Sequence, residues 1–140
     1  MSEKQSTVRS HPLLLALLGL LALFYTASGL LLYFTPEDTF AGLPAYYGDF
    51  NLHFVKDAGL AFLSSGVLLL AAVRTPAHRL RYSLCGALFV VLHALFHLQM
   101  LVGGMIPPDY YGYEFVQIFL PALLLVVAVA WLASDGRQSK

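Results

Sequence analysis

The chain contains an uninterrupted run of 22 uncharged and mostly apolar residues, 13–34, which is longer than most buried helices of small soluble domains. As an α-helix rising about 1.5 Å per residue, this run can cross a hydrocarbon layer of about 30 Å. Of the 140 residues, 59% are hydrophobic and only 11% are charged, and the mean hydropathy is +0.72. A soluble domain carries about twice this charged fraction. The sequence therefore predicts an integral membrane protein.

Three further apolar runs follow the first one. The run 58–73 contains only 16 residues, so a full crossing has to include several of the residues before it, among them His53, Lys56 and Asp57. A Gly-Gly and a Pro-Pro pair end the third run, and Pro121 predicts a kink or an opening in the hydrogen-bond ladder of the fourth. We therefore expect one domain over residues 1–140, with spans at about 12–34, 52–73, 81–102 and 113–133.

Lys and Arg are distributed unevenly among the segments that connect these runs. They occur near the N-terminus, in the second connection and in the C-terminal tail. The charged residues of the first and third connections are all acidic. The positive-inside rule places the basic segments in the cytoplasm. Short connections make consecutive helices antiparallel neighbours. We predict an all-α, up-down-up-down four-helix bundle in a bacterial inner membrane, with both termini cytoplasmic. At its outer end, an interfacial aromatic belt is expected from Tyr46, Tyr47, Tyr110, Tyr111 and Tyr113.

Ionisable side chains occur within or close to three of the predicted spans. His53 and Asp57 share one face of the second span, and His93 and His97 share one face of the third, because residues four apart differ by about 40° around a helix axis. The helical rise places these four residues and Glu114 in the outer half of one bundle. Imidazole and carboxylate groups bind transition metals, a histidine from each of two spans could hold a haem, and the same groups could handle protons. The predicted site is therefore a metal, haem or proton-handling redox site.

Small residues also follow helical faces in the first three spans. On the first span these are Gly19, Ala22, Thr26 and Gly29. On the second, Ala61 and Ser64 continue the face of Asp57, and on the third, Gly86 and Gly104 continue the face of the two histidines. Small residues let membrane helices approach closely, so each face is expected to meet another helix.

Two other interpretations of the polar residues stay open. Buried histidines can simply bond helices together, and the protein would then be an accessory or assembly subunit of a membrane complex. Alternatively, the protein binds a lipid or a quinone, with Asp57 and a histidine as acid and base. Whether the chain is an enzyme is left open. The expected partners are the lipid bilayer and other membrane subunits or further copies of the chain; without a basic patch, nucleic acid is not expected.

The stretch 29–72 resembles small bacterial four-helix membrane proteins of the DoxX-like type. In that group a first helix ends near a proline, a loop follows, and the second helix opens with a stretch of the type HFV-[KR]-D, here residues 53–57. The resemblance implies four helices, and an association with membrane redox or thiol-stress complexes as in some members. The chain departs from a thiol relay, because Cys85 is its only cysteine. No catalytic residue is therefore carried over.

Overall fold

The structure is a computed structural model that describes residues 11–138. Four long helices dominate it: α1 (Pro12–Phe34), α3 (Leu52–Arg74), α4 (Arg79–Val102) and α6 (Leu120–Gln138). Short helical elements connect them: α2 (Pro36–Ala41), η1 (Ala45–Tyr47), η2 (Pro76–His78), η3 (Pro108–Tyr110), α5 (Tyr111–Glu114) and the π-helical η4 (Phe115–Phe119). The part of the chain that the structure describes contains no β-strand, so the all-α prediction is confirmed.

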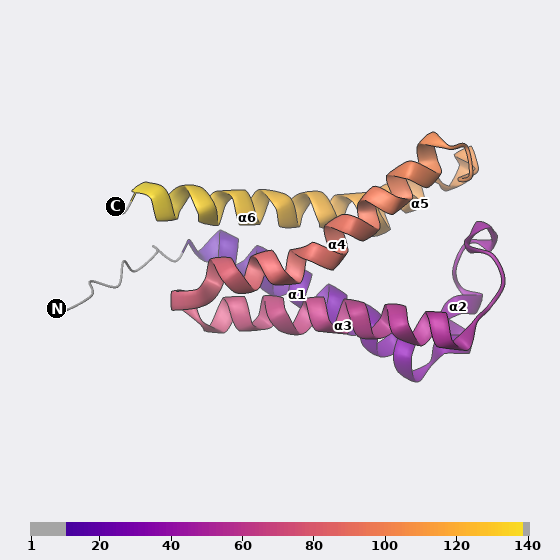
Figure 1. Ribbon diagram of the computed structural model, residues 1–140, viewed down its shortest axis with the longest axis horizontal. Coiled ribbons are helices and arrows are strands. Elements are labelled where there is room, and N and C mark those ends of the chain that lie inside the picture. The colour runs from indigo at the N-terminus through magenta and orange to yellow at the C-terminus, as the bar shows by residue number, and fades with distance from the viewer. Residues whose placement is uncertain (1–10, 139–140) are drawn as a thin grey trace.

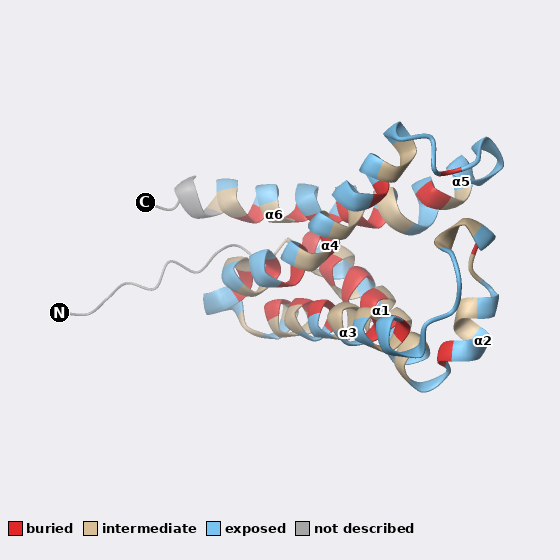
Figure 2. Ribbon diagram, turned by 45° about the vertical axis from the view of Figure 1, so that its right-hand side comes forward, coloured by how far each residue is buried: buried red, intermediate tan, exposed pale blue. Residues whose placement is uncertain are grey.

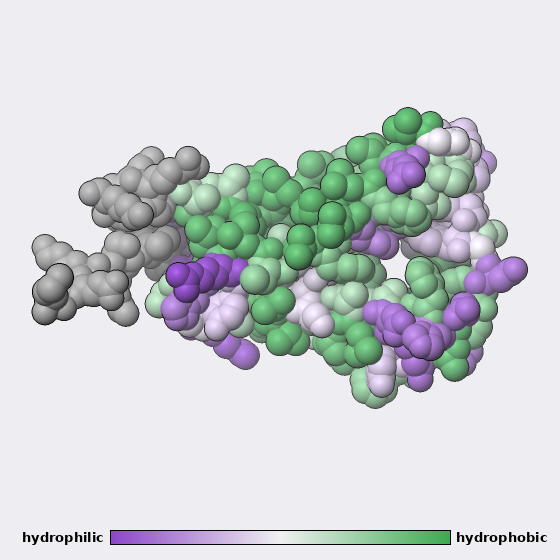
Figure 3. All heavy atoms as spheres, in the orientation of Figure 1, coloured by the Kyte–Doolittle hydropathy of each residue, from purple (hydrophilic) through white to green (hydrophobic). Residues whose placement is uncertain are grey.

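Four helical stretches are long and apolar enough to cross a membrane: Pro12–Phe34, Leu52–Arg74, Pro76–Val102 and Pro108–Asp135. Figure 3 shows apolar side chains over the middle of the molecule and polar ones gathered near its two ends. Large apolar side chains such as Leu13, Phe34 and Val102 are strongly exposed. A water-soluble monomer rarely exposes so much apolar surface, whereas acyl chains would cover it. The chain thus has the helices of a multi-pass membrane protein, as its composition predicts.

The four long helices pack against one another, except that the C-terminal half of α4 diverges from α3. Helix α1 packs most extensively on α3, α4 packs on both α3 and α6, and α6 also contacts α1. Buried residues lie along these contacts, as the red segments of the ribbon in Figure 2 show. At the start of α1, His11 Nε2 lies 3.1 Å from Asp135 Oδ2 near the end of α6. Figures 1 and 2 show the C-terminal half of α4 turning away from α3, so that these two helices diverge toward the end that carries α2 and α5.

Glycines bring the backbones of α1 and α3 into direct contact. A Cβ atom added to Gly29 would lie 2.5 Å from the Leu63 nitrogen, and one added to Gly66 would lie 2.5 Å from the Thr26 nitrogen. The predicted small-residue face of the first span is therefore confirmed at Thr26 and Gly29. It is wrong at Gly19, where an added Cβ would meet nothing within 4 Å.

The turn between α3 and α4 is held by Arg79, which is buried. Its Nε donates to the Ala72 carbonyl at 3.1 Å, and one terminal nitrogen lies 3.5 Å from the Val73 carbonyl. These carbonyls belong to the last turn of α3, where no helical N–H remains to satisfy them and the helix dipole favours a cation. In the sequence, the charge of Arg79 serves only as a signal of orientation. In the structure, Arg79 also caps the C-terminal end of α3.

Pro121 follows a widened turn of the fourth span. The segment Phe115–Phe119 is π-helical, and the Leu120 N–H donates to the Phe115 carbonyl instead of the Val116 carbonyl. Such π turns accommodate a residue that the α-helical ladder cannot, and they are common at functional sites. The opening expected at Pro121 is present, directly after the buried Glu114.

Candidate functional site

A buried histidine–carboxylate pair joins the third and fourth spans. His97 Nδ1 on α4 lies 2.7 Å from Glu114 Oε2 on α5, and the two residues are 1% and 0% exposed. Both were expected in the outer half of the bundle from helical rise, and the structure brings them into contact. If Nδ1 carries the proton, it donates to the carboxylate, and the second ring nitrogen, Nε2, becomes an acceptor.

Two tyrosines from the loop between α2 and α3 complete the surroundings of the carboxylate. The hydroxyls of Tyr46 and Tyr47 both donate to Glu114 Oε1, the second at 3.0 Å. Together with His97, three side chains from two separate segments can donate to this one carboxylate. This is how a buried carboxylate avoids the cost of an unsatisfied charge. We call Tyr46, Tyr47, His97 and Glu114 the carboxylate cluster.

His93 extends this cluster one helical turn further into the bundle. The ring centroids of His93 and His97 are 4.5 Å apart. On its other sides, His93 lies 5.2 Å from the Phe62 ring of α3 and 5.5 Å from the Phe89 ring of its own helix. His93 therefore stands between the polar cluster and an aromatic layer that closes the contact of α3 with α4.

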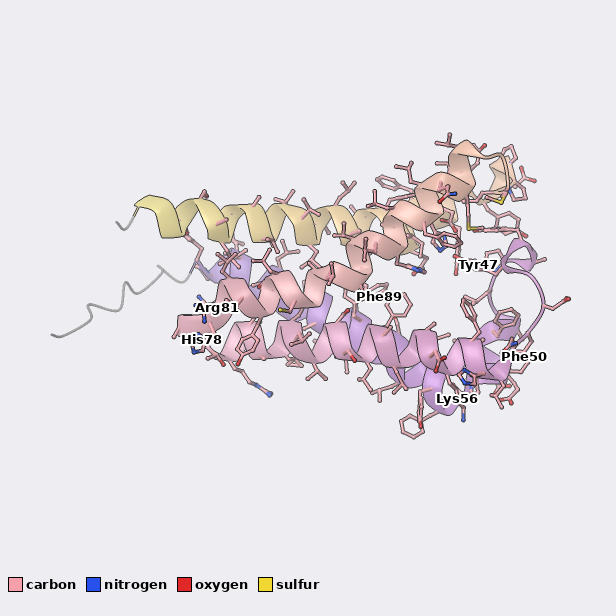
Figure 4. The ribbon with its side chains drawn as sticks, in the orientation of Figure 1. Tyr47, Phe50, Lys56, His78, Arg81 and Phe89 are labelled. Atoms are coloured by element: carbon pink, nitrogen blue, oxygen red, sulfur yellow. The ribbon has the colours of Figure 1, made fainter. Side chains whose placement is uncertain are left out.

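An opening lies beside this group of rings. Figure 3 shows the molecule hollowed between the diverging end of α4 with α5 and the beginning of α3. In Figure 4, Phe89 lies between α4 and α3, and Tyr47 reaches from its loop toward α4 and α5. The tyrosine loop therefore covers the outer end of the space between the two diverging helices, while the aromatic layer closes its inner end.

His53 and Asp57 do not join the carboxylate cluster. They pair with each other, His53 Nδ1 to Asp57 Oδ2 at 2.8 Å, and their side chains are 87% and 61% exposed. The expectation that the face of Asp57, Ala61 and Ser64 meets another helix is wrong, since Asp57 and Ser64 are exposed. The buried positions of α3 lie on other faces, at Gly59 and Gly66 among others. Of the five predicted site residues, the structure thus unites His93, His97 and Glu114.

Metal binding has no complete ligand set in this arrangement. Within residues 11–138, no three His, Cys, Asp or Glu side chains are grouped so that they could hold one metal ion. The Nδ1 atom of His97 is already paired with Glu114, so a metal ion could be bound by at most the two imidazoles of His93 and His97. Metal and haem binding therefore stay predictions from the sequence.

The role of Tyr46 and Tyr47 was not predicted from the sequence, in which they indicate only part of an aromatic belt. The signal available was weak: two adjacent phenols after Pro44, in the longest connection between predicted spans. Their partner is 67 or more positions away in the chain, and local patterns carry no information about such a contact. Pro44 itself is buried and starts the single turn η1 that orients both side chains.

The environment of the loop tyrosines predicts an alkaline transition. Burial, and secondly the Glu114 carboxylate, raise the pKa of Tyr46 and Tyr47 well above the ordinary 10.0. A raised tyrosine pKa favours the neutral phenol in the folded state, so its contribution to stability is complete below pH 10 and is lost as the pH rises above it. In a spectroscopic titration of tyrosinate, the double variant Tyr46→Phe/Tyr47→Phe should match the wild type up to about pH 10. Its absorbance should fall short only in stronger alkali. A deficit already present at pH 10 would contradict the burial of these phenols.

Comparisons of the chain with protein-family models, with curated proteins and with solved structures found no match.

Proposed function

We propose that the protein binds a membrane-soluble ligand of the quinone class in the opening between α3 and α4, with His97 as the residue that forms a hydrogen bond with it. The observation that carries this proposal is the buried His97–Glu114 pair at 2.7 Å. A carboxylate that holds Nδ1 fixes the ring and its tautomer, and it makes Nε2 a better proton acceptor. If the pair only held the helices together, the ring of His93 would not be needed 4.5 Å from the ring of His97.

The surroundings fit a flat ring that carries oxygen atoms. Phe62, Phe89 and Tyr47 offer aromatic surfaces around the two histidines. The hydroxyl of a quinol would donate to Nε2 of His97, and a quinone carbonyl would accept from the same nitrogen once it is protonated. An apolar tail could leave between the diverging helices toward the acyl chains, because the opening faces the side of the bundle.

The orientation of the protein belongs to the same proposal. We propose, from the loop charges and the positive-inside rule, that both termini lie in the cytoplasm and the tyrosine loop on the extracytoplasmic side of a bacterial inner membrane. The carboxylate cluster then lies just below the outer surface, where the polar head of the ligand is close to water. The resemblance to DoxX-like proteins, some of which belong to redox complexes, agrees with this direction but rests on residues 29–72 only.

The proposal is tested by binding of a short-chain ubiquinol to the full chain in mild detergent, measured by titration calorimetry. His97→Ala should weaken binding at least about tenfold, because a hydrogen bond to an oriented imidazole is lost. The matched control is His78→Ala, which removes an exposed histidine from the opposite end of the bundle. Mass spectrometry of an organic extract of the purified protein identifies any ligand that co-purifies.

Two results would overturn the proposal. The first is absence of ubiquinol binding by the folded wild-type protein. The second is equal affinity in wild type and His97→Ala. Either result, together with a loss of stability in His97→Ala, would favour the structural interpretation, in which the cluster only bonds the tyrosine loop to α4 and α5.

A further inference from the structure

A second polar group lies on the outside of the bundle, away from the carboxylate cluster. It lines an open groove of about 490 Å³ formed by Tyr33, Leu52, His53, Lys56, Asp57 and Leu60. We infer that this groove binds the head group of a phosphatidylethanolamine molecule, with Lys56 and His53 on the phosphate and Asp57 on the primary amine. This inference is independent of the ligand proposed for His97.

The depth of Asp57 is the first argument. It lies five residues after the start of α3, about 7–8 Å along the helix axis, and only 16 uncharged residues separate it from Arg74. A full span needs about 20 residues, so Asp57 lies at the edge of the hydrocarbon layer or within it. Its side chain is 61% exposed, and His53 is the partner that the fold gives it. A carboxylate at this level needs further polar contact from the membrane side.

The arrangement of charges is the second argument. Lys56 lies one position before Asp57, and its ammonium is 5.2 Å from the centroid of the Tyr33 ring. Tyr33 belongs to α1, so the lysine is held against the neighbouring helix, while Asp57 pairs with His53 on α3. The groove thus presents a cation and an anion side by side, bordered by the partly exposed Leu52 and Leu60.

Phosphatidylethanolamine matches this pattern better than other phospholipids. Its phosphate is an anion for Lys56 and His53, and its ammonium has three N–H groups that can donate to Asp57. Phosphatidylcholine has the same charges but no N–H donor, and phosphatidylglycerol has no amine at all. The carboxylate should therefore discriminate among the three lipids, while the lysine should not.

Native mass spectrometry of the full chain in detergent, with each lipid added separately, tests the inference. The wild type should bind phosphatidylethanolamine about tenfold more tightly than phosphatidylcholine. Asp57→Asn should lose this preference, whereas Lys56→Gln should weaken binding of all three lipids. Asp49→Asn, which removes an exposed acidic residue at the same end outside the groove, is the matched control and should bind like the wild type.

The inference is overturned by equal binding of phosphatidylethanolamine and phosphatidylcholine by the wild type, by a preference for phosphatidylglycerol, or by an unchanged preference in Asp57→Asn. A dimer that dissociates on the Asp57→Asn change would also overturn it, because a second copy of the chain would then occupy the groove. If the helical circular dichroism of a variant is unchanged, a loss of folding is not the cause of its altered lipid binding. Loss of ubiquinol binding at His97 leaves these lipid preferences unchanged, so the two proposals fail separately.

Discussion

Replacing Glu114 with alanine is expected to destabilise the protein by about 3–5 kcal/mol, the cost of removing a carboxylate from its buried hydrogen-bonding partners. The carboxylate is fully buried and accepts from three side chains. Without it, the His97 Nδ1 group and both loop phenols lose their partner, and each such loss costs about 1–3 kcal/mol where water cannot replace the bond. The tyrosine loop should also detach, because the carboxylate is its hydrogen-bonding contact with α5.

Conservative variants separate the contributions to this loss. Glu114→Gln keeps the volume of the side chain but turns one acceptor oxygen into a donor, so one of the three donors faces another donor and an intermediate loss is expected. Tyr47→Phe leaves the carboxylate bound by Tyr46 and His97, so it should cost about 1 kcal/mol. The expected order of destabilisation is Glu114→Ala, Glu114→Gln, then Tyr47→Phe.

The measurement is reversible unfolding in mixed detergent and sodium dodecyl sulfate, followed by near-ultraviolet circular dichroism. Glu37→Ala is the control, since it removes an exposed acidic side chain of α2 at the same end of the molecule. If Glu114→Ala unfolds at the same sodium dodecyl sulfate fraction as Glu37→Ala, the hydrogen bonds of the carboxylate contribute nothing to stability. The structural interpretation of the cluster would then be wrong.

The helices of this protein are easier to predict from sequence than the site, because apolar length is a local property. Charges and prolines mark where each apolar run ends, so four spans follow from the sequence without knowledge of packing. The hydrogen bond between His97 and Glu114 was not predicted, but their common level was, since both residues lie near the ends of consecutive helices joined by a short connection. Helical rise alone then brings them to the same level.

The face of α3 that points into the bundle was predicted wrongly from its polar residues. We expected Asp57 to face inward because charged groups in membranes usually do. The close approach of α1 instead selects the face of Gly59 and Gly66. Asp57 and Gly59 are two positions apart, about 200° around the helix, so an inward Gly59 turns Asp57 outward. Two glycines seven residues apart were the sequence signal for the correct face.

The tyrosine loop lay beyond sequence reasoning for a different reason. Its conformation depends on contacts with segments far along the chain, and its residues have no helical period that would predict a face. Tyr46 and Tyr47 gain their role only when η1 places them over Glu114. Such loop contacts are commonly where function resides, because a rigid bundle positions a few residues of a connecting segment.

Substituting Gly29 or Gly66 with alanine is expected to cost about 1–3 kcal/mol each, because a methyl group would enter the backbone of the facing helix. At Gly29 the new Cβ would lie 2.5 Å from the Leu63 nitrogen and 2.7 Å from the Gly59 carbonyl oxygen. Neither atom can move without shifting a whole helix. The same reversible unfolding measures the loss. Gly19→Ala is the matched control on α1, where an added Cβ meets nothing and better helix propensity should leave stability unchanged or slightly raised.

The double variant Gly29→Ala/Gly66→Ala distinguishes a rigid-body shift from two local clashes. The two contacts lie one turn apart along the same helix pair, since Gly29 meets Leu63 and Gly66 meets Thr26. Once the first methyl group has moved α1 away from α3, the second meets less resistance, so the combined cost should be clearly smaller than the sum of the single costs. Full additivity would mean that each clash is relieved locally. Single variants as stable as Gly19→Ala would show that the backbones of α1 and α3 are not in contact.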